Sequence, residues 1–465
     1  MPTTDLPPTL QTPAFLQILN LVRDPIAFFD HHLAQQGDTF TSRVLGPGGP
    51  PVVFVGNPTS VEQIFTAPLE TFCLGQVTHV FRPLTGDRSL IMLDGSEHLR
   101  QRKLLMPPLH GQRMQVYREA ITTITLEVLR ALPQNRPITL RPYLADITLQ
   151  VILRVVFGLE PGPRYAALQT LIAEMLEAIT QPFYSSCFFF EFLQQDFGPW
   201  SPWGHFVRQM GEIDRLVYAE IRDRRAQFPG ASGRQRTDVL SLLLTAHDEA
   251  GQGLTDQELR DQLMTLLLLG HETTASSLAW AMYWVLSHPA VYQQLRADPS
   301  PSNAQDYLTA VCNETLRLYP IALIAQPRIA KTDYDLSDYH CPAGTVLVPC
   351  IYLAHRRPEV FPEPLRFMPE RFLNRQFSPA EFFPFGGGHR GCIGMAFSLF
   401  EMRLILQTLL NQGDWELMAN QQVQPVRRGI TIVPSSGVKV RYTASPVPIA
   451  LALNSADADR ASVAK

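Results

Sequence analysis

The residues best suited to chemistry lie in one short loop at positions 382–396, which reads FFPFGGGHRGCIGMA. Three consecutive glycines allow a tight turn, Arg390 supplies positive charge, and Cys392 stands directly before the helix expected at 397–410. A thiol at a helix N-terminus beside cationic groups has its thiolate form favoured, and the thiolate is the form that binds a metal. The pattern therefore predicts that Cys392 is a metal-binding thiolate.

Three kinds of site compete for this loop. A lone cysteine without further ligands at suitable spacing is a poor zinc site, whereas one axial thiolate is enough for haem iron. Residues 386–391 also match the G-x-G-x-x-G dinucleotide fingerprint, but Pro384 interrupts the strand that should precede it, and no βαβ series surrounds it. A buried structural cysteine in a glycine-rich turn is the third interpretation. The loop favours a haem thiolate.

A second motif, LGHETT at positions 269–274, lies in the middle of a long expected helix. This helix should begin at Thr255, where a capping box starts, and run without proline to His288. A zinc-binding H-E-x-x-H motif is excluded because Ala275 stands where the second histidine is required. Gly270 is unfavourable in mid-helix, and threonine hydroxyls can bond back to carbonyls one turn earlier, so we expect a local opening of the helix here.

The loop and the helix together resemble those of the cytochrome P-450 haem-thiolate monooxygenases. The family's F-x-x-G-x-R-x-C-x-G loop is present in full, as Phe385, Gly388, Arg390, Cys392 and Gly394. The resemblance extends through most of the chain and implies a mainly α fold with a minor β part. It also implies haem b (iron protoporphyrin IX) bound through Cys392, and oxidation of an organic substrate with O₂ and two externally supplied electrons.

The resemblance assigns roles to the long helix. In the family motif [A/G]-G-x-[D/E]-T-[T/S], the acid and the first threonine deliver protons during oxygen activation. The matching catalytic residues here are Glu272 and Thr273. Leu269 stands where the family usually has a small residue, and we expect it to narrow the space beside the haem.

The resemblance also implies partners for the haem and for the loop. Two haem propionates need cationic or hydrogen-bonding groups, because buried unpaired carboxylates are costly. The cofactor-binding residues at matching positions are Cys392, Arg390, Arg328, Arg102 and His98, with Phe385 and Gly394 in the loop itself. His98 and Arg102 share one helical face at i, i+4 spacing, although many family members have tryptophan in place of His98. A structural triad of Glu314, Arg317 and Arg371 is implied before the loop.

The remaining elements follow from strand and turn signals. A β-hairpin is expected near 38–56 and short strands near 328–350, with helices between 58 and 320 and a further helix at 304–318. No linker divides the chain. We therefore expect a single haem domain at 1–444, followed by a flexible tail at 445–465.

Composition limits the classes of partner. The chain has 465 residues, 45% hydrophobic and 18% charged, with a net charge of −4, so it is globular and offers no basic field for nucleic acid. Six scattered cysteines without C-x-x-C indicate a reducing compartment, expected to be the cytoplasm. No apolar run approaches the roughly 18 residues that a spanning helix requires. A monomer without a transmembrane anchor is expected.

Partners and substrate are expectations of the resemblance. A ferredoxin or flavodoxin, with its reductase, should donate electrons to a basic face that carries Arg102, Lys103 and Arg390. An aromatic-rich segment that the family places at the pocket entrance predicts a lipophilic substrate such as a fatty acid or a terpenoid, although ordinary core packing would explain it equally well. Its ten aromatic residues are Phe183, Tyr184, Phe188, Phe189, Phe190, Phe192, Phe197, Trp200, Trp203 and Phe206.

Other activities of the same fold stay open. A peroxide-driven hydroxylase or an isomerase is possible on these elements, but such enzymes often lack the acid–threonine pair that this chain has. A non-enzymatic haem sensor or carrier is the third class, and turnover with a reductant would separate it from a monooxygenase.

Overall fold

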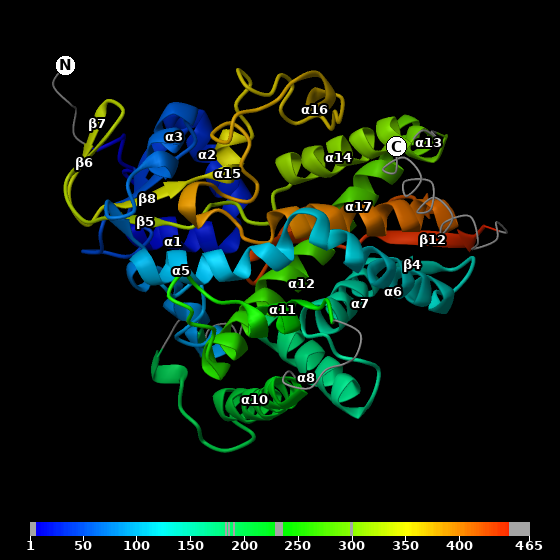
Figure 1. The fold of residues 1–465 in the computed structure, drawn as a ribbon. Helices are drawn as coiled ribbons and strands as arrows, with labels where there is room; N and C mark the ends of the chain where they lie inside the picture. The colour runs from blue at the N-terminus through cyan, green and yellow to red at the C-terminus, as the bar shows by residue number, and fades with distance from the viewer. Residues whose placement is uncertain are drawn as a thin grey trace, which may run out of the picture.

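A computed structural model describes residues 6–181, 184, 187–188, 191–227, 236–297 and 301–445. The expected tail lies outside the described residues apart from its first position. The fold is mainly helical, as predicted, with small sheets at its margins (Figure 1). The helices are α1 (Ala14–Arg23), α2 (Pro25–Gln36), α3 (Pro58–Thr66), α4 (Arg82–Thr85), α5 (Gly95–Leu105), α6 (Arg118–Ala131), α7 (Arg141–Val151), α8 (Pro163–Thr180), α10 (Pro202–Gln227), α11 (Val239–Thr245), α12 (Asp256–Ser287), α13 (Pro289–Ala297), α14 (Pro301–Leu318), α15 (Ile351–Ala354), α16 (Arg371–Asn374) and α17 (Met395–Gln412).

Helix α12 is the central element and has 32 residues. Its predicted capping box is present, because Thr255 Oγ1 accepts from the Glu258 N–H at 3.2 Å and the Glu258 carboxylate accepts from the Thr255 N–H at 2.8 Å. Helices α7, α10, α14 and α17 pack around it, and its residue Trp280 is fully buried. The predicted opening at Gly270 is wrong, since the helix continues through this position.

The described strands form four small sheets that lie at opposite margins of the molecule (Figure 1). The predicted N-terminal hairpin is confirmed, because β1 (Thr39–Ser42) pairs antiparallel with β2 (Val52–Val55). Strand β8 (Val346–Pro349) lies parallel to β2, and the sheet has the order β1-β2-β8-β5-β3. The remaining strands are β3 (Phe72–Cys73), β4 (Pro137–Thr139), β5 (Arg328–Ala330), β6 (Tyr334–Leu336), β7 (Tyr339–Cys341), β9 (Gly413–Leu417), β10 (Pro425–Arg428), β11 (Thr431–Pro434) and β12 (Lys439–Ala444).

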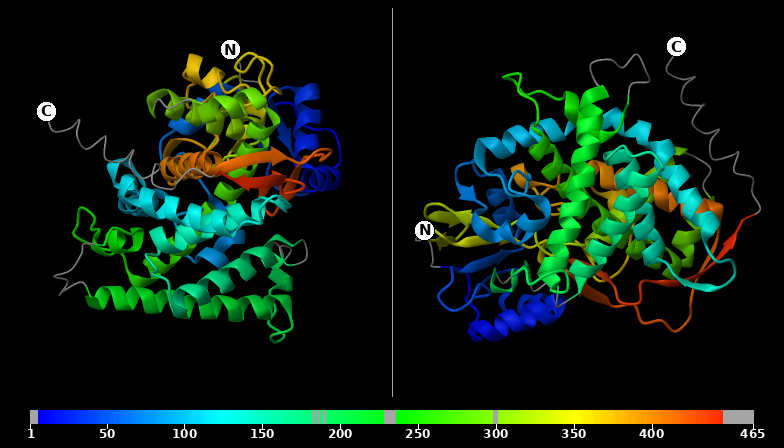
Figure 2. Two further views of the ribbon diagram at one scale, coloured as in Figure 1. Left: turned by 90° about the vertical axis from the view of Figure 1, so that its right-hand side faces the viewer. Right: turned by 90° about the horizontal axis from the view of Figure 1, so that it is seen from below.

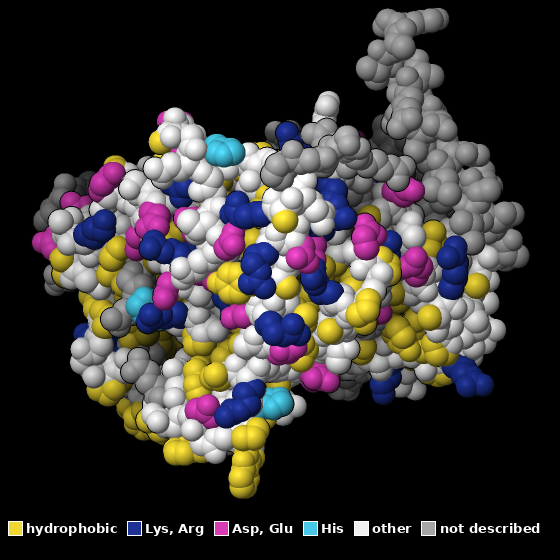
Figure 3. Space-filling model, turned by 60° about the horizontal axis from the view of Figure 1, so that its bottom comes forward, with side chains coloured by type: hydrophobic (Ala, Val, Ile, Leu, Met, Phe, Trp, Pro, Cys, Tyr) yellow, Lys and Arg dark blue, Asp and Glu magenta, His cyan; other side chains and the backbone are white. Residues whose placement is uncertain are grey.

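The C-terminal strands were not predicted. Strand β12 pairs with β9 and β4, and β10 pairs with β11 in a separate hairpin. The α8–α10 pair forms a layer below the body that holds α12, as the left view of Figure 2 shows, and α8 meets the β10–β11 hairpin through the Arg428–Glu177 ion pair. Side chains of both charge signs are mixed with hydrophobic ones on the face in Figure 3, so that face carries no uniform basic field. Among the described residues, no helix is both long and apolar enough to cross a membrane.

Candidate active site

Cys392 lies between the short 3-10 turn η6 (Gly388–Arg390) and the start of α17, as predicted. Its backbone N–H donates to the Phe385 carbonyl at 2.8 Å, which closes the loop. Gly388 has a φ of +63°, and a Cβ atom at this position would lie 2.3 Å from the backbone oxygen of Phe65. Glycine is therefore required here, both for its conformation and for its close contact with α3.

The Cys392 side chain is accessible from one side, although protein atoms closely surround its sulfur. Burial raises the pKa of the thiol, while the Gly394 N–H and the charge of Arg102 act in the opposite direction. The predicted preference for the thiolate is thus wrong for the protein chain alone, because desolvation outweighs both favourable groups. Metal coordination would reverse this balance, since a bound metal ion deprotonates a thiol.

Five basic side chains converge near this loop and are called the basic cluster: His98, Arg102, Arg328, His389 and Arg390. Burial, with repulsion from Arg390 and Arg102, lowers the pKa of His98 to about 3. Burial and neighbouring cations likewise lower the pKa of Arg328 to about 9, of Arg390 to about 10 and of His389 to about 4. Each of these groups lies close enough to shift the pKa of another. The structure therefore brings together all four propionate partners expected from the sequence.

The basic cluster is short of negative charge. Among the described residues, the carboxylate that pairs with it is Asp94, which accepts a hydrogen bond from Arg390. The buried Nδ1 of His98 and the buried Nε of Arg328 have no hydrogen-bond partner in the described part of the chain. Buried cations without counter-charges are costly, so the cluster fits an anionic ligand with more than one acidic group. Haem, with its two propionates, is such a group.

His389 was missed in the sequence-based assignment. Its ring lies 6.4 Å from that of His98, centroid to centroid. Its position in the GGGHRGC run, one residue before Arg390, was the available signal, because the tight η6 turn places both residues beside the same cluster.

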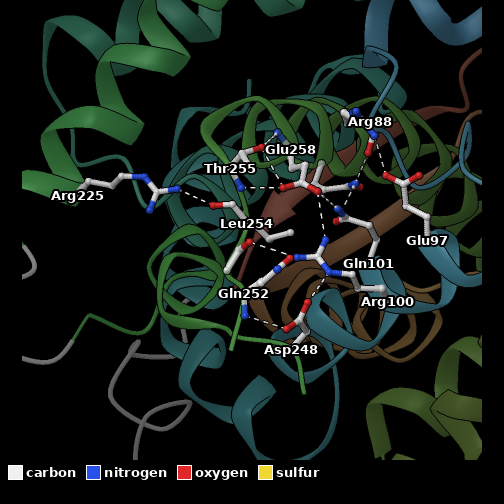
Figure 4. A network of polar contacts seen from close by, with 12 residues as sticks. Arg88, Glu97, Arg100, Gln101, Arg225, Asp248, Gln252, Leu254, Thr255 and Glu258 are labelled. Carbon is white, nitrogen blue, oxygen red and sulfur yellow. Dashed lines mark hydrogen bonds and ion pairs between the residues drawn. The ribbon is translucent and has the colours of Figure 1, made fainter. Parts of the chain in front are cut away.

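A polar network holds α5, which carries His98 and Arg102, against the N-terminus of α12 (Figure 4). Arg100 Nε donates to Asp248 at 2.5 Å, and its Nη1 donates to Glu258 at 3.2 Å. Gln101 also donates to Glu258, at 2.5 Å. Because Glu258 belongs to the capping box of α12, the network fixes the basic cluster relative to α12.

Glu272 and Thr273 both line a large cavity beside α12. The Glu272 carboxylate forms an ion pair with Arg141 and lies 3.5 Å from Arg428 Nε. Neither arginine was identified from the sequence, because they lie far from Glu272 along the chain. Thr273 Oγ1 donates to the Leu269 carbonyl at 2.6 Å, so its own oxygen is left as an acceptor toward the cavity.

The cavity has a volume of about 1000 Å³. Leucine, isoleucine, valine and phenylalanine side chains form most of its wall. They come from α1, α2, the β1–β2 loop, the 3-10 segment η1 (Gly75–Phe81), α4, α8, Phe188, α12 and the β10–β11 hairpin. Leu269, the residue that departs from the family pattern, is part of this wall as expected. A volume of this size is at the upper end of small-molecule pockets and is suited to a large lipophilic ligand.

The aromatic-rich segment contributes less to the cavity than predicted. Phe188 lines the cavity and contacts Trp203 and Phe206 edge-on, at 5.7 and 5.1 Å between ring centroids. Tyr184, Trp203 and Phe206 line a separate pocket of about 10 Å³. Exposed side chains of the segment are Phe192, Phe197 and Trp200, and Phe183, Phe189 and Phe190 lie outside the described residues.

The expected triad before the loop is present. Arg317 donates to Glu314 at 2.7 and 2.9 Å, and Arg371 Nε donates to the same carboxylate at 3.1 Å. Glu314 and Arg317 are fully buried. The triad therefore joins α14 to the segment that leads into the Cys392 loop.

Fold, loop and basic cluster together define a haem-binding oxidoreductase. The family model described as "Cytochrome P450" matches residues 6–441. The chain belongs to the cytochrome P450 family. It is accordingly a haem-dependent monooxygenase, and family membership implies a redox partner and a lipophilic substrate.

Similar proteins come from mycobacteria. "Putative cytochrome P450 135B1" of Mycobacterium tuberculosis is 31% identical over 458 residues, covering 95% of this chain and 92% of the relative. "Putative cytochrome P450 137" of the same organism is 34% identical over 410 residues, covering 88% and 84%. A solved structure, "Retinoic acid bound cyanobacterial CYP120A1", has a TM-score of 0.78 at 24% identity, covering 95% of this chain and 100% of that one. This structural likeness supports the fold.

Proposed function

We propose that Cys392 is the axial ligand of haem b and that the basic cluster binds its propionates. The observation that carries this proposal is the convergence of five basic groups beside the loop that holds the exposed Cys392. Two of these groups have buried nitrogens without a partner in the described chain. Bound haem supplies the activation of O₂ by which one oxygen atom enters an organic substrate while the other is reduced to water. Phe385 and Gly394 hold the loop on either side of the sulfur.

Glu272 and Thr273 are proposed to move protons at the cavity wall. The ion pairs with Arg141 and Arg428 hold the Glu272 carboxylate beside the cavity. The Thr273 oxygen, whose own proton is engaged by the Leu269 carbonyl, can accept a hydrogen bond from a water molecule or a protonated group in the cavity. Glu272 exchanges protons with solvent, and Thr273 orients the group that receives them.

Replacing Thr273 with alanine is expected to uncouple electron use from product formation. The variant should bind haem and substrate, because Thr273 lies on the cavity wall and, among the described residues, its side chain donates to the Leu269 and Gly270 carbonyls of its own helix. We expect product per electron to fall roughly tenfold, with peroxide released instead, below the ~10²–10⁴-fold typical of a full acid–base role because Glu272 remains. Peroxide and product are measured per reductant consumed, with Thr273→Ser as the control that restores the hydroxyl. Unchanged coupling in the alanine variant contradicts the assignment.

The proposed substrate is a fatty acid or a terpenoid-like molecule that is hydroxylated or otherwise oxidised. The apolar wall and the volume of the cavity support this class over small polar molecules. A peroxide-driven hydroxylase or an isomerase is the alternative, and a sensor or carrier is a third. Turnover with an electron donor and O₂, compared with turnover with peroxide alone, separates all three.

The electron donor is proposed to be a small acidic ferredoxin or flavodoxin. The residues assigned to its docking face need correction. Arg390 is buried and paired with Asp94, and Arg102 is half-buried in the basic cluster, because both point inward. Lys103 is exposed but pairs with Glu249 at 3.0 Å. Exposed Arg113 in the 3-10 segment η3 (Gly111–Tyr117), which packs beside α17, offers a further positive charge on this side.

Reduction by such a donor should slow with salt. If Lys103 and Arg113 steer the donor, the bimolecular reduction rate should fall roughly tenfold from low to high ionic strength. The double variant Lys103→Gln with Arg113→Gln should weaken this dependence, and Arg441→Gln, on β12, is the control that removes a positive surface charge elsewhere. Stopped-flow reduction is the measurement. A rate independent of salt in the unmodified protein argues against electrostatic docking.

We also propose that residues 1–444 form one haem domain. The protein is proposed to be a monomer and to lie in the cytoplasm. The six cysteines are all free, which agrees with a reducing compartment.

A further inference from the structure

The outer end of the large cavity differs chemically from its inner end. The inner end carries Leu268, Leu269 and the Glu272–Thr273 pair of α12. The outer end, called the rim, is formed where the end of α1 meets the β10–β11 hairpin, and its apolar members Val22, Leu45, Val426 and Ile430 are 40–54% exposed. The charged residues of the rim that line the cavity are Arg23, Asp24 and Arg427, and the Asp24 carboxylate accepts from the Ala27 N–H at 3.0 Å as the cap of α2. The cavity thus joins an apolar interior to a positively charged opening.

Arg427 is held in place without a counter-charge. Its Nε donates to the Gly429 carbonyl at 2.8 Å, and its Nη1 donates to the Val22 carbonyl at 3.3 Å. These two bonds join the guanidinium to both sides of the rim, and Nη2 makes no hydrogen bond within the described part of the chain. No carboxylate among the described residues forms an ion pair with Arg427.

The neighbouring arginine shows the contrast. Arg428 also lines the cavity, but it donates to Glu177 at 2.5 Å and lies 3.5 Å from Glu272. Its positive charge is therefore already balanced by two acids. Successive residues of one strand thus give one satisfied and one unsatisfied guanidinium beside the same cavity.

The environment of Arg427 makes an anion favourable there. Arg427 is exposed at the rim, although partial desolvation of its guanidinium by the surrounding protein atoms lowers its pKa. Arginine nevertheless stays protonated in proteins at neutral pH. A guanidinium that keeps a free donor and has no ion-pair partner in the described chain gains most from a charge-assisted, planar hydrogen bond, which a carboxylate supplies.

We infer that Arg427 binds the carboxylate of a lipophilic carboxylic acid at the rim, so that the apolar chain extends inward to Thr273. The inference rests on the proposed function and narrows its substrate class. The reverse orientation is disfavoured, because the guanidiniums beside Glu272, those of Arg141 and Arg428, are already paired with carboxylates. Arg23, exposed at the same rim and without an ion-pair partner in the described chain, adds to the positive potential.

The test compares ligands that differ only in their head group. Dodecanoic acid, methyl dodecanoate and dodecanol are titrated into the haem-loaded protein, by calorimetry and by the change in haem spin state. We expect the acid to bind roughly 10- to 100-fold more tightly than the ester or the alcohol, as for a hydrogen-bonded charge. Arg427→Gln should remove this preference, and Arg427→Lys should keep part of it. Arg441→Gln, on β12 and paired with Glu416, is the matched control that should retain it.

The outcomes separate this inference from the proposed function. Equal binding of acid and ester by the unmodified protein, binding of neither, or a preference that survives Arg427→Gln overturns the role of Arg427. If the reduced, carbon-monoxide-bound protein has a normal thiolate band in these cases, the monooxygenase proposal stands. If that band is missing, the proposed thiolate ligation fails, and calorimetry still reports whether Arg427 selects the acid.

Discussion

Cys392→Ala should abolish the haem-thiolate spectrum of the reduced, carbon-monoxide-bound protein completely. Cys392 is the cysteine that stands in the glycine-rich loop, before α17 and beside the basic cluster. Alanine has no ligand atom, so the thiolate band should disappear even where some haem is retained through the propionate partners. Absorbance spectra and a haem assay on the same preparation provide the measurement.

Matched cysteine variants make this prediction specific. Burial raises the pKa of Cys312 and Cys350 to about 12 and that of Cys341 to about 11, so these thiols stay protonated in the protein. Cys350→Ala and Cys73→Ala should therefore leave the thiolate band unchanged per haem bound. The assignment is wrong if the band survives in Cys392→Ala, or if it is lost in either control while haem stays bound.

Local patterns predicted the parts of the structure that depend on nearby residues. The capping box at Thr255 correctly gave the start of α12, because both of its hydrogen bonds form between residues three positions apart. The turn-forming block between two β-prone runs correctly gave the β1–β2 hairpin. The Cys392 loop was predicted for the same reason, since its glycines, its arginine and its cysteine lie within ten residues.

Contacts between distant segments could not be predicted. Arg141 and Arg428 approach Glu272 from α7 and from β10, and no spacing in the sequence relates them to α12. Strand β12 depends on pairing with β9 and β4, which it meets only in the folded protein. The predicted direction of the Cys392 pKa shift was likewise wrong, because desolvation depends on all the atoms that surround the sulfur.

The same sequence pattern can have opposite structural meanings. The spacing E-x-x-R occurs at Glu212–Arg215 in α10 and at Glu314–Arg317 in α14. The first pair is 46% and 63% exposed, and the second is 0% exposed at both side chains. The sequence alone supports only a weak surface interaction for either pair. Burial in the folded protein decides which of them is important for stability.

Glu314→Ala should destabilise the protein by about 3–5 kcal/mol, because it leaves Arg317 buried without its counter-charge. It also removes the acceptor of the Met368 N–H, at 2.9 Å, and of Arg371, so the segment before the Cys392 loop loses its attachment to α14. Haem loss should therefore accelerate together with unfolding. Urea unfolding and transfer of haem to an acceptor protein measure the two effects, and Glu212→Ala, in the exposed E-x-x-R pair, should change neither. Equal effects of the two variants would show that the triad has no special role, since burial and the bonds from Arg371 and Met368 distinguish Glu314 from its exposed counterpart.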